Sequence, residues 1–474
     1  MPTFESNVVA NYQTVEYGKF VEIKNNTLYP AISVTRFNPQ NPPNSFVEVY
    51  PKYAVLVKNV DNNTVNYNSS GNLNLASDAF GRMRTSSPLT LFDSSHRFAD
   101  NNLWATLSGG SPTASVSATF DQNEGLINLN VDSLSGSKLY RETTKVFSYQ
   151  PGKSLQIMST FTFNQSKTNL RQRVGYFGNQ NGIYLELDDS TLYMVERSSV
   201  TGSVSSIRIP QSQWNIDKLD GNGPSGVTLD ITKAQILFID IEWLGLGTVR
   251  TGFVINGQFV PCHYFHHANI IDKTYITTAS LPLRYEIENK AATSGPSRLK
   301  QVCSTVISEG GYELRGLQQA TGTSILSAKA LTTAGTFYPV VSIRLKSTPI
   351  NRLDGIVILT ALSIMGVGTG IYKWQVTASG TTSGGTWTDA GVNSCVEYKL
   401  DGTGVSGGRV LASGYLASNT QGSTSIDILK EALFKFQLER NSFTNTPYEL
   451  TLSVTASTNG ELVHGSMDWE EISR

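Results

Sequence analysis

Short segments in which apolar and polar residues alternate recur along the chain, and Gly, Asn, Asp, Ser or Pro separates them. Period-2 alternation at residues 126–131 and 155–163 predicts half-buried β-strands, and the nearly continuous apolar run 236–243 predicts a buried central strand. Asp-Asp-Ser at 188–190 and Asn-Gly at 256–257 predict tight hairpin turns. Further strands are predicted at 173–177, 183–187, 192–197, 251–255, 258–261, 340–345, 355–363, 371–378, 434–440 and 449–456.

Helical periodicity is scarce by comparison. The best candidate is residues 425–434, with Ser425 as an N-cap. The sequence therefore predicts an all-β protein.

The length of 474 residues indicates two to four domains. Residues 1–95 have few apolar positions and a Pro/Asn-rich stretch, and they are predicted to form an N-terminal β arm or anchor. Residues 96–316 hold the best-patterned strands and are predicted to form a β-sandwich. The small, polar segment 317–336 is interpreted as a linker. Residues 337–474 are predicted to form a second, C-terminal β-sandwich.

Charge is balanced, with 37 Lys and Arg against 38 Asp and Glu, and charged residues make up 16% of the chain. A basic excess for nucleic-acid binding is absent. No apolar run of about 18 residues predicts a membrane span, and residues 1–10 do not resemble a signal peptide. Three widely spaced cysteines, an odd number, favour reduced thiols made in a cytoplasm. The charged fraction is low, and uncharged polar residues taking its place are typical of extracellular β-proteins and assembly subunits. These features together favour a protein that is made in a cytoplasm and functions in a particle outside it.

One ordered set of motifs resembles a known group of proteins. Residues 78–86 read Asp-Ala-Phe-Gly-Arg-Met-Arg-Thr-Ser, and residues 90–94 read Thr-Leu-Phe-Asp-Ser. This pattern resembles a D-x-F-G-R-x-R-x-S…T-L-F-D-S signature of structural proteins from tailed phages, especially marine and cyanobacterial ones. The resemblance continues through residues 140–142, 149–154, 171–177, 181–186, 240–245, 265–269 and 308–312, and the chain end at 465–471 is also similar.

Members of that group are described as virion structural or tail-fibre-like proteins, and the resemblance implies a lectin-like jelly roll for residues 96–316. It also implies a component of the virus particle. The Pro/Asn-rich N-terminal arm cannot bury much surface alone, so it is expected to attach to another virion protein. A homotrimer is the first expectation for its oligomeric state, and a host-surface glycan is a candidate ligand. The main hypothesis is a tail-associated fibre or baseplate-peripheral protein that contributes to host adsorption. The alternatives are a capsid or neck decoration protein and, more remotely, a glycan-degrading enzyme.

Two pairs of acids are candidates for catalytic groups. Some jelly-roll glycosidases carry three acids on one face of a strand. Asp240 and Glu242 share such a face, but Phe238 stands where the nucleophile belongs. Glu186 and Asp188 lack a third acid two or three residues later. Both sets are incomplete, so the sequence favours a non-enzymatic protein. Possible ion-pair partners for Asp240 and Glu242 are Arg171, Arg173 and Arg250.

The cluster His263, His266 and His267 beside Cys262 contains metal-ligand residue types, but its spacing does not match a zinc motif. Packing and hydrogen bonding at a sheet end are the favoured interpretation. Oxygens of Asn179, Asn181, Asp188 and Asp189 could supply a calcium loop, although turn chemistry also favours these residues. The sequence therefore predicts no catalytic, cofactor or metal site.

Aromatic residues gather around the hairpin predicted near residue 189. Exposed aromatic rings suit sugar stacking or a subunit interface, whereas alternation would bury about half of them. The candidate glycan or interface residues are Tyr176, Tyr184, Tyr193, Asp188 and Asp189.

Overall fold

The computed structural model describes residues 87–109, 115–310, 316–347, 354–417 and 437–473, together with five short strands before residue 87. The chain divides into two compact units, residues 1–85 and 86–474. In the first unit, three strands form one antiparallel sheet and two form another. These strands are β1 (Phe20–Val21), β2 (Ile32–Arg36), β3 (Phe46–Glu48), β4 (Val55–Lys58) and β5 (Thr64–Tyr67).

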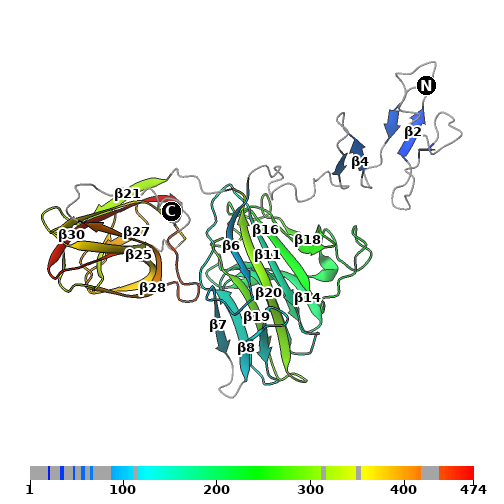
Figure 1. Cartoon of the computed structure of the whole chain (residues 1–474). Coiled ribbons are helices and arrows are strands. Elements are labelled where there is room, and N and C mark those ends of the chain that lie inside the picture. The colour runs from blue at the N-terminus through cyan, green and yellow to red at the C-terminus, as the bar shows by residue number, and fades with distance from the viewer. Residues whose placement is uncertain are drawn as a thin grey trace. The chain divides into compact units, whose positions relative to one another are not determined.

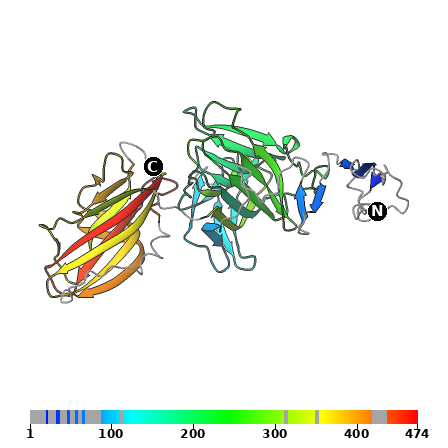
Figure 2. The same cartoon turned by 90° about the horizontal axis from the view of Figure 1, so that it is seen from above.

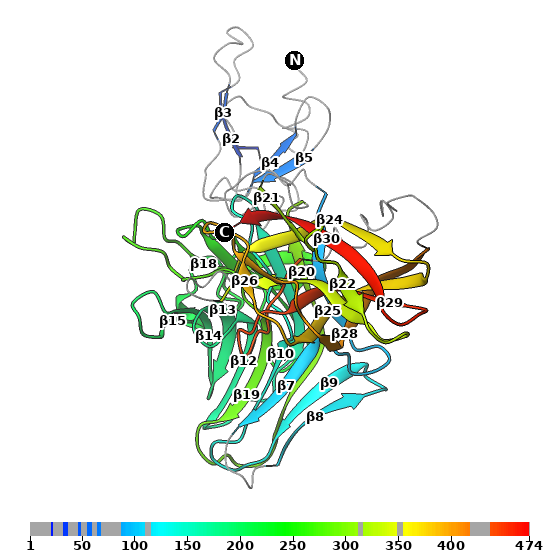
Figure 3. The same cartoon turned by 90° about the vertical axis from the view of Figure 1, so that its left-hand side faces the viewer.

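The second unit begins with a sandwich of two antiparallel sheets. The first sheet has seven strands in the order β15 (Ser205–Pro210), β14 (Thr191–Ser198), β13 (Gly182–Asp188), β12 (Leu170–Phe177), β19 (Leu283–Asn289), β10 (Lys138–Thr143) and β7 (Trp104–Gly109). Figure 3 labels β7, β10 and β19 next to one another.

The facing sheet has eight strands. Their order is β18 (Gln258–Phe265), β17 (Val249–Ile255), β16 (Gln235–Ile241), β11 (Leu155–Thr162), β20 (Ser297–Ser308), β9 (Leu126–Val131) and β8 (Val116–Asp121), and β6 (Leu89–Ser95) also pairs with β20. Figure 1 shows β6, β11, β16 and β20 side by side in this layer. A 3₁₀ turn at Gln211–Gln213 follows β15.

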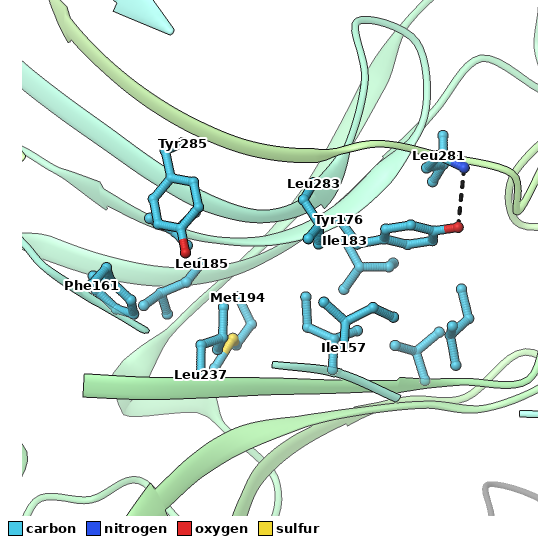
Figure 4. Packing of buried hydrophobic residues seen from close by; sticks show 14 of the residues in the cluster. Ile157, Phe161, Tyr176, Ile183, Leu185, Met194, Leu237, Leu281, Leu283 and Tyr285 are labelled. Carbon is cyan, nitrogen blue, oxygen red and sulfur yellow. Dashed lines mark hydrogen bonds between the residues drawn. The ribbon is translucent and has the colours of Figure 1, made fainter. Parts of the chain in front are cut away.

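One continuous hydrophobic core fills the space between these two sheets. Because side chains alternate along a strand, every second residue points inward. Ile157, Phe161 and Leu237 of the eight-stranded sheet face Tyr176 and Tyr285 of the seven-stranded sheet (Figure 4). Burying large apolar side chains in this way contributes roughly 1.5–3 kcal/mol each.

Both predicted hairpin turns form. Asn256 and Gly257 join β17 to β18 with φ angles of 53° and 73°. Positive φ at both positions is what a two-residue type I′ turn requires, and Asn-Gly tolerates it best. Asp189, with φ of 55°, lies in the short turn between β13 and β14.

The C-terminal sandwich contains the second large hydrophobic core. Its six-stranded sheet has the order β26 (Thr388–Asp389), β27 (Val396–Lys399), β23 (Tyr338–Leu345), β29 (Glu449–Ala456), β25 (Ile371–Ser383) and β28 (Gly404–Ala417). In the other sheet, β30 (Glu461–Ser473) pairs with β21 (Leu317–Gly322), β22 (Lys329–Leu331) and β24 (Ile356–Val367). Figure 2 shows β24 (yellow) beside β30 (red).

The all-β prediction, with a jelly-roll sandwich and a second C-terminal sandwich, is confirmed. Two expected boundaries differ from the observed strands. Strand β6 falls within the residues assigned to the arm, yet it pairs with β20 of the jelly roll. Strands β21 and β22 fall within the expected linker, yet both pair with β30. The helix expected at 425–434 and the first part of the strand expected at 434–440 lie outside the described residues.

Candidate functional site

The outer face of the seven-stranded sheet is lined with charged and aromatic side chains. The inward residues of its strands belong to the core, so the alternate residues point away from it. We call this surface the charged face. It is formed by Lys138, Tyr140, Glu142, Arg171, Arg173, Phe177, Tyr184, Glu186, Asp188, Tyr193, Arg197, Arg208, Arg284, Glu286 and Glu288.

Glu286 lies at the centre of the charged face and contacts three cations. Its carboxylate is 2.7 Å from Arg173 Nη1, 3.0 Å from Arg284 Nη2 and 3.2 Å from Lys138 Nζ. Only 2% of the Glu286 side chain is exposed. Burial opposes ionisation, but the charges of Arg284, Arg173 and Lys138 outweigh burial and lower the pKa of Glu286 to about 2.

Glu142 contacts Arg284 as Glu286 does, but the pKa of Glu142 shifts in the opposite direction. The Glu142 carboxylate lies 3.3 Å from Arg284 Nη1, and 3% of its side chain is exposed. Burial raises the pKa of Glu142 to about 7, because it outweighs the attraction of Arg284, and Glu286 adds repulsion. One of the two carboxylates therefore keeps its charge while the other holds a proton until near-neutral pH.

This difference predicts a pH effect that Glu142→Gln removes. The folded-state pKa is raised above its ordinary value of 4.5, so the native state binds the proton more tightly than the unfolded state. Stability from this group is complete below pH 4.5 and is lost as pH rises to 7, by up to about 3 kcal/mol. Relative to wild type, the Gln variant should gain stability over that range in urea unfolding. Parallel curves for the two proteins from pH 4.5 to 8 would contradict this prediction.

The acid pair Glu186 and Asp188 lies on this face and is held by cations. Glu186 accepts hydrogen bonds of 2.6 Å from both Arg173 Nε and Arg208 Nε. Asp188 is 2.6 Å from Arg208 Nη2 and 2.5 Å from Lys290 Nζ. Burial opposes ionisation of Asp188, but Lys290 and Arg208 lower its pKa. A general acid requires a raised pKa, so Asp188 is arranged as an ion-pair member.

The aromatic residues of the charged face form a small cluster under guanidinium groups. The rings of Phe177 and Tyr184 lie 4.4 Å apart, and both are buried. The Arg197 guanidinium lies 5.0 Å from the Tyr184 ring centroid and 5.7 Å from that of Phe177. Contacts of this kind are cation–π interactions, and they fix the orientation of the planar guanidinium.

The candidate glycan residues separate into different environments. Tyr176 is fully buried in the core, and its hydroxyl donates towards the carbonyls of Phe147 (2.8 Å) and Ala279 (2.6 Å). Tyr184 is on the charged face but only 2% exposed. Neither ring is available for sugar stacking, because alternation along β12 places Tyr176 in the core and packing against Phe177 buries Tyr184. Tyr193 is half-buried beneath Arg208, whose guanidinium lies 4.1 Å from the ring centroid. Asp189 pairs with Lys290 at 3.0 Å.

Asp240 is in β16 of the other sheet, on the face that points away from the main core, and Glu242 follows directly after the end of this strand. Both side chains have no exposed surface, and Arg250 lies opposite Asp240 on β17. The expected alternative partners Arg171 and Arg173 are on the charged face instead. Phe238, at the position of the missing nucleophile, packs edge-on against Phe259 at 5.2 Å.

The three histidines do not converge. His263 Nδ1 accepts from the Asn215 amide at 3.3 Å, and His266 Nδ1 lies 3.2 Å from Thr248 Oγ1. His267 contacts Glu196 and the Gly247 carbonyl. Cys262 is buried in the core, and none of the three cysteines forms a disulfide.

The calcium candidates likewise have other partners. Asn179 accepts from Arg284, and Asn181 contacts Thr277 and Ser199. Among the residues that the structure describes, no group of three His, Cys, Asp or Glu side chains is placed to hold a metal ion. Within the same residues, no helix is long and apolar enough to cross a membrane.

Sequence reasoning missed the residues at the centre of the charged face: Lys138, Arg197, Arg284 and Glu286. The signal that could have found them is the alternation in β19, where Arg284, Glu286 and Glu288 take every second position between Leu283, Tyr285 and Ile287. This pattern predicts a strand with one charged face.

No family model matches the chain, and no curated protein matches it. Solved structures resemble about half of it. They include the carbohydrate recognition domain of Emp47p (11% identity, 46% of this chain and 96% of that chain, TM-score 0.28). The CBM2 module of the evolved Dit of Lactobacillus casei BL23 phage J-1 is 6% identical over 48% of this chain and 99% of that one, with a TM-score of 0.33. The laminarinase catalytic domain of Thermotoga maritima MSB8 is 12% identical over 48% and 100%, with a TM-score of 0.33.

Proposed function

We propose that this chain is a structural protein of a bacteriophage particle, built into a tail-associated fibre or the periphery of a baseplate. The signature at residues 78–94 supports the particle assignment. In this proposal the N-terminal region attaches to another virion protein, and three copies assemble into a symmetric appendage. The two sandwiches are displayed outward, and the protein acts by binding.

A role in adsorption rests on one observation, which is that the side chains of the charged face hold one another in fixed positions. Its buried carboxylates and guanidiniums fix one another, as Arg173 does between Glu186 and Glu286. A surface that is already ordered loses little conformational entropy when a ligand binds. Charged hydrogen-bonding groups that are held in place suit a polar ligand such as a host-surface glycan.

The same observations give less support to two other functions. A capsid or neck decoration protein would use the same sandwiches without needing an ordered polar face. A glycan-degrading enzyme needs an acid and a base or nucleophile within reach of a sugar. Glu186 and Asp188 are held in ion pairs, and Asp240 and Glu242 have no exposed surface.

The test is to locate the protein on intact particles by immunogold electron microscopy with antibody against the jelly roll. The proposal expects label at the tail tip or baseplate. Label spread over the head would replace it with the decoration function. Absence of label and of the protein itself from purified particles would reject a virion role.

A further inference from the structure

We infer that Arg197 is the centre of a binding site for an anionic sugar residue, which rests on the glycan-binding role proposed above. The first observation is the absence of a charged partner. Arg197 donates to the Gly178 carbonyl at 3.1 Å and to the Tyr184 hydroxyl at 2.9 Å, and both acceptors are uncharged. Among the described residues, no carboxylate lies within ion-pair distance of it.

Every other arginine or lysine of the charged face has a carboxylate partner. Arg284 and Arg173 share Glu286, and Arg208 contacts both Glu186 and Asp188. The remaining two cations, Lys138 and Arg171, pair with Glu286 and Glu288. The positive charge left over on this face is therefore concentrated at Arg197.

The second observation is that neighbouring groups hold the Arg197 guanidinium in one position. Its central carbon lies 5.0 Å from the Tyr184 ring centroid and 5.7 Å from that of Phe177, and its two hydrogen bonds use only part of its five N–H donors. Arg197 is half-buried, so part of the residue is accessible from solvent. A fixed planar fork matches the two oxygens of a carboxylate, and little rotamer entropy remains to be lost on binding.

The neighbours of Arg197 fit a polar ligand as well. Ser206 lies directly across from it on β15, and the Ser206 side chain is exposed. Its hydroxyl can donate to the same anion or accept from a sugar hydroxyl. Gly182 lies opposite on β13 and adds no side chain beside the guanidinium. The geometry therefore points to a uronic-type sugar whose carboxylate meets Arg197 while its ring hydroxyls contact the neighbouring edge of the sheet.

The test is calorimetric titration of the full chain with hexagalacturonate, a sulfated hexasaccharide and neutral cellohexaose. The site predicts that hexagalacturonate binds and cellohexaose does not. Arg197→Gln should weaken hexagalacturonate binding at least about 10-fold, the effect expected for a charge-assisted hydrogen bond. Arg197→Lys keeps the charge but loses the planar fork, so it should also bind more weakly than wild type.

The matched control is Arg298→Gln. Arg298 is exposed on β20 of the opposite sheet, donates to Asn130 at 3.0 Å and carries the same charge. Equal loss in the two Gln variants would show a general charge effect and overturn the site, as would equal binding of the acidic and neutral sugars or no binding of either acidic one. Binding of the sulfated sugar alone would overturn the carboxylate assignment. Tail labelling together with any of these results would leave the particle function standing, and a urea unfolding curve of Arg197→Gln that matches wild type would exclude misfolding of that variant.

Discussion

Replacing Glu286 with glutamine is expected to destabilise the jelly roll by about 3 kcal/mol at pH 7. The folded pKa of Glu286 is about 2 against an ordinary value of 4.5, and each pKa unit corresponds to about 1.4 kcal/mol. The variant leaves Arg173, Arg284 and Lys138 without the carboxylate that they share. Breaking a buried ion pair from one side typically costs about 3–5 kcal/mol, which agrees with this magnitude.

The sign of the pH dependence gives a sharper test. Because the folded pKa is lowered, the stabilisation is present above pH 4.5 and is lost as pH falls towards 2. The difference between wild type and variant should therefore shrink across that window. Hydrogen exchange of peptides from β12, β13 and β19, measured over a urea series, reports the unfolding of this sheet.

Glu288→Gln is the matched control, since Glu288 is two residues along the same strand. Its side chain is 20% exposed and pairs with Arg171, which is itself 26% exposed. Partly exposed ion pairs contribute at most about 1 kcal/mol. Equal losses in the two variants would mean that the centre of the charged face has no special role in stability.

Much of the fold could be predicted because its strands alternate in a simple way. Residues 126–131 match β9, and residues 449–456 match β29. Strands β19 and β20 were missed, although both are central. β19 has a charged residue at every second position, and β20 mixes Lys, Gln, Ser and Thr with its apolar residues. Strands with a polar outer face are overlooked when residue composition is given more weight than the two-residue period of the apolar positions.

The candidate site was only partly predictable. The cluster around residue 184 was found, since Tyr184, Glu186 and Asp188 share one face of β13. Parity alone could have placed Tyr176 in the core, because Arg173 and Phe177 take the outward positions of β12. The partners of these residues were not predictable. Arg173 pairs with Glu286, which is 113 positions away, and only the order of strands β12 and β19 brings the two together.

His267→Leu is expected to destabilise the jelly roll by about 3–5 kcal/mol, because it leaves a buried carboxylate without its partner. His267 Nε2 lies 2.8 Å from Glu196 Oε2, and its Nδ1 lies 2.6 Å from the Gly247 carbonyl. Both side chains are about 5% exposed or less. The imidazole also stacks on Tyr275 at 3.9 Å, so the variant loses a ring contact as well.

The two hydrogen bonds of His267 constrain where protons lie. A carbonyl oxygen only accepts, so Nδ1 must donate to Gly247, and the contact with Glu196 then needs a second proton on Nε2 or on the carboxyl. Glu196→Gln supplies a different solution, because its amide N–H can donate to a neutral Nε2. This variant should stay within about 1 kcal/mol of wild type. The same hydrogen-exchange measurement, applied to peptides of β14 and β18, compares the two variants. Equal destabilisation of the two variants would show that the loss comes from disturbing the surroundings of Glu196 and not from removing the imidazole donor. A large loss in His267→Leu alone would show that this histidine joins β14 to the loop before β17.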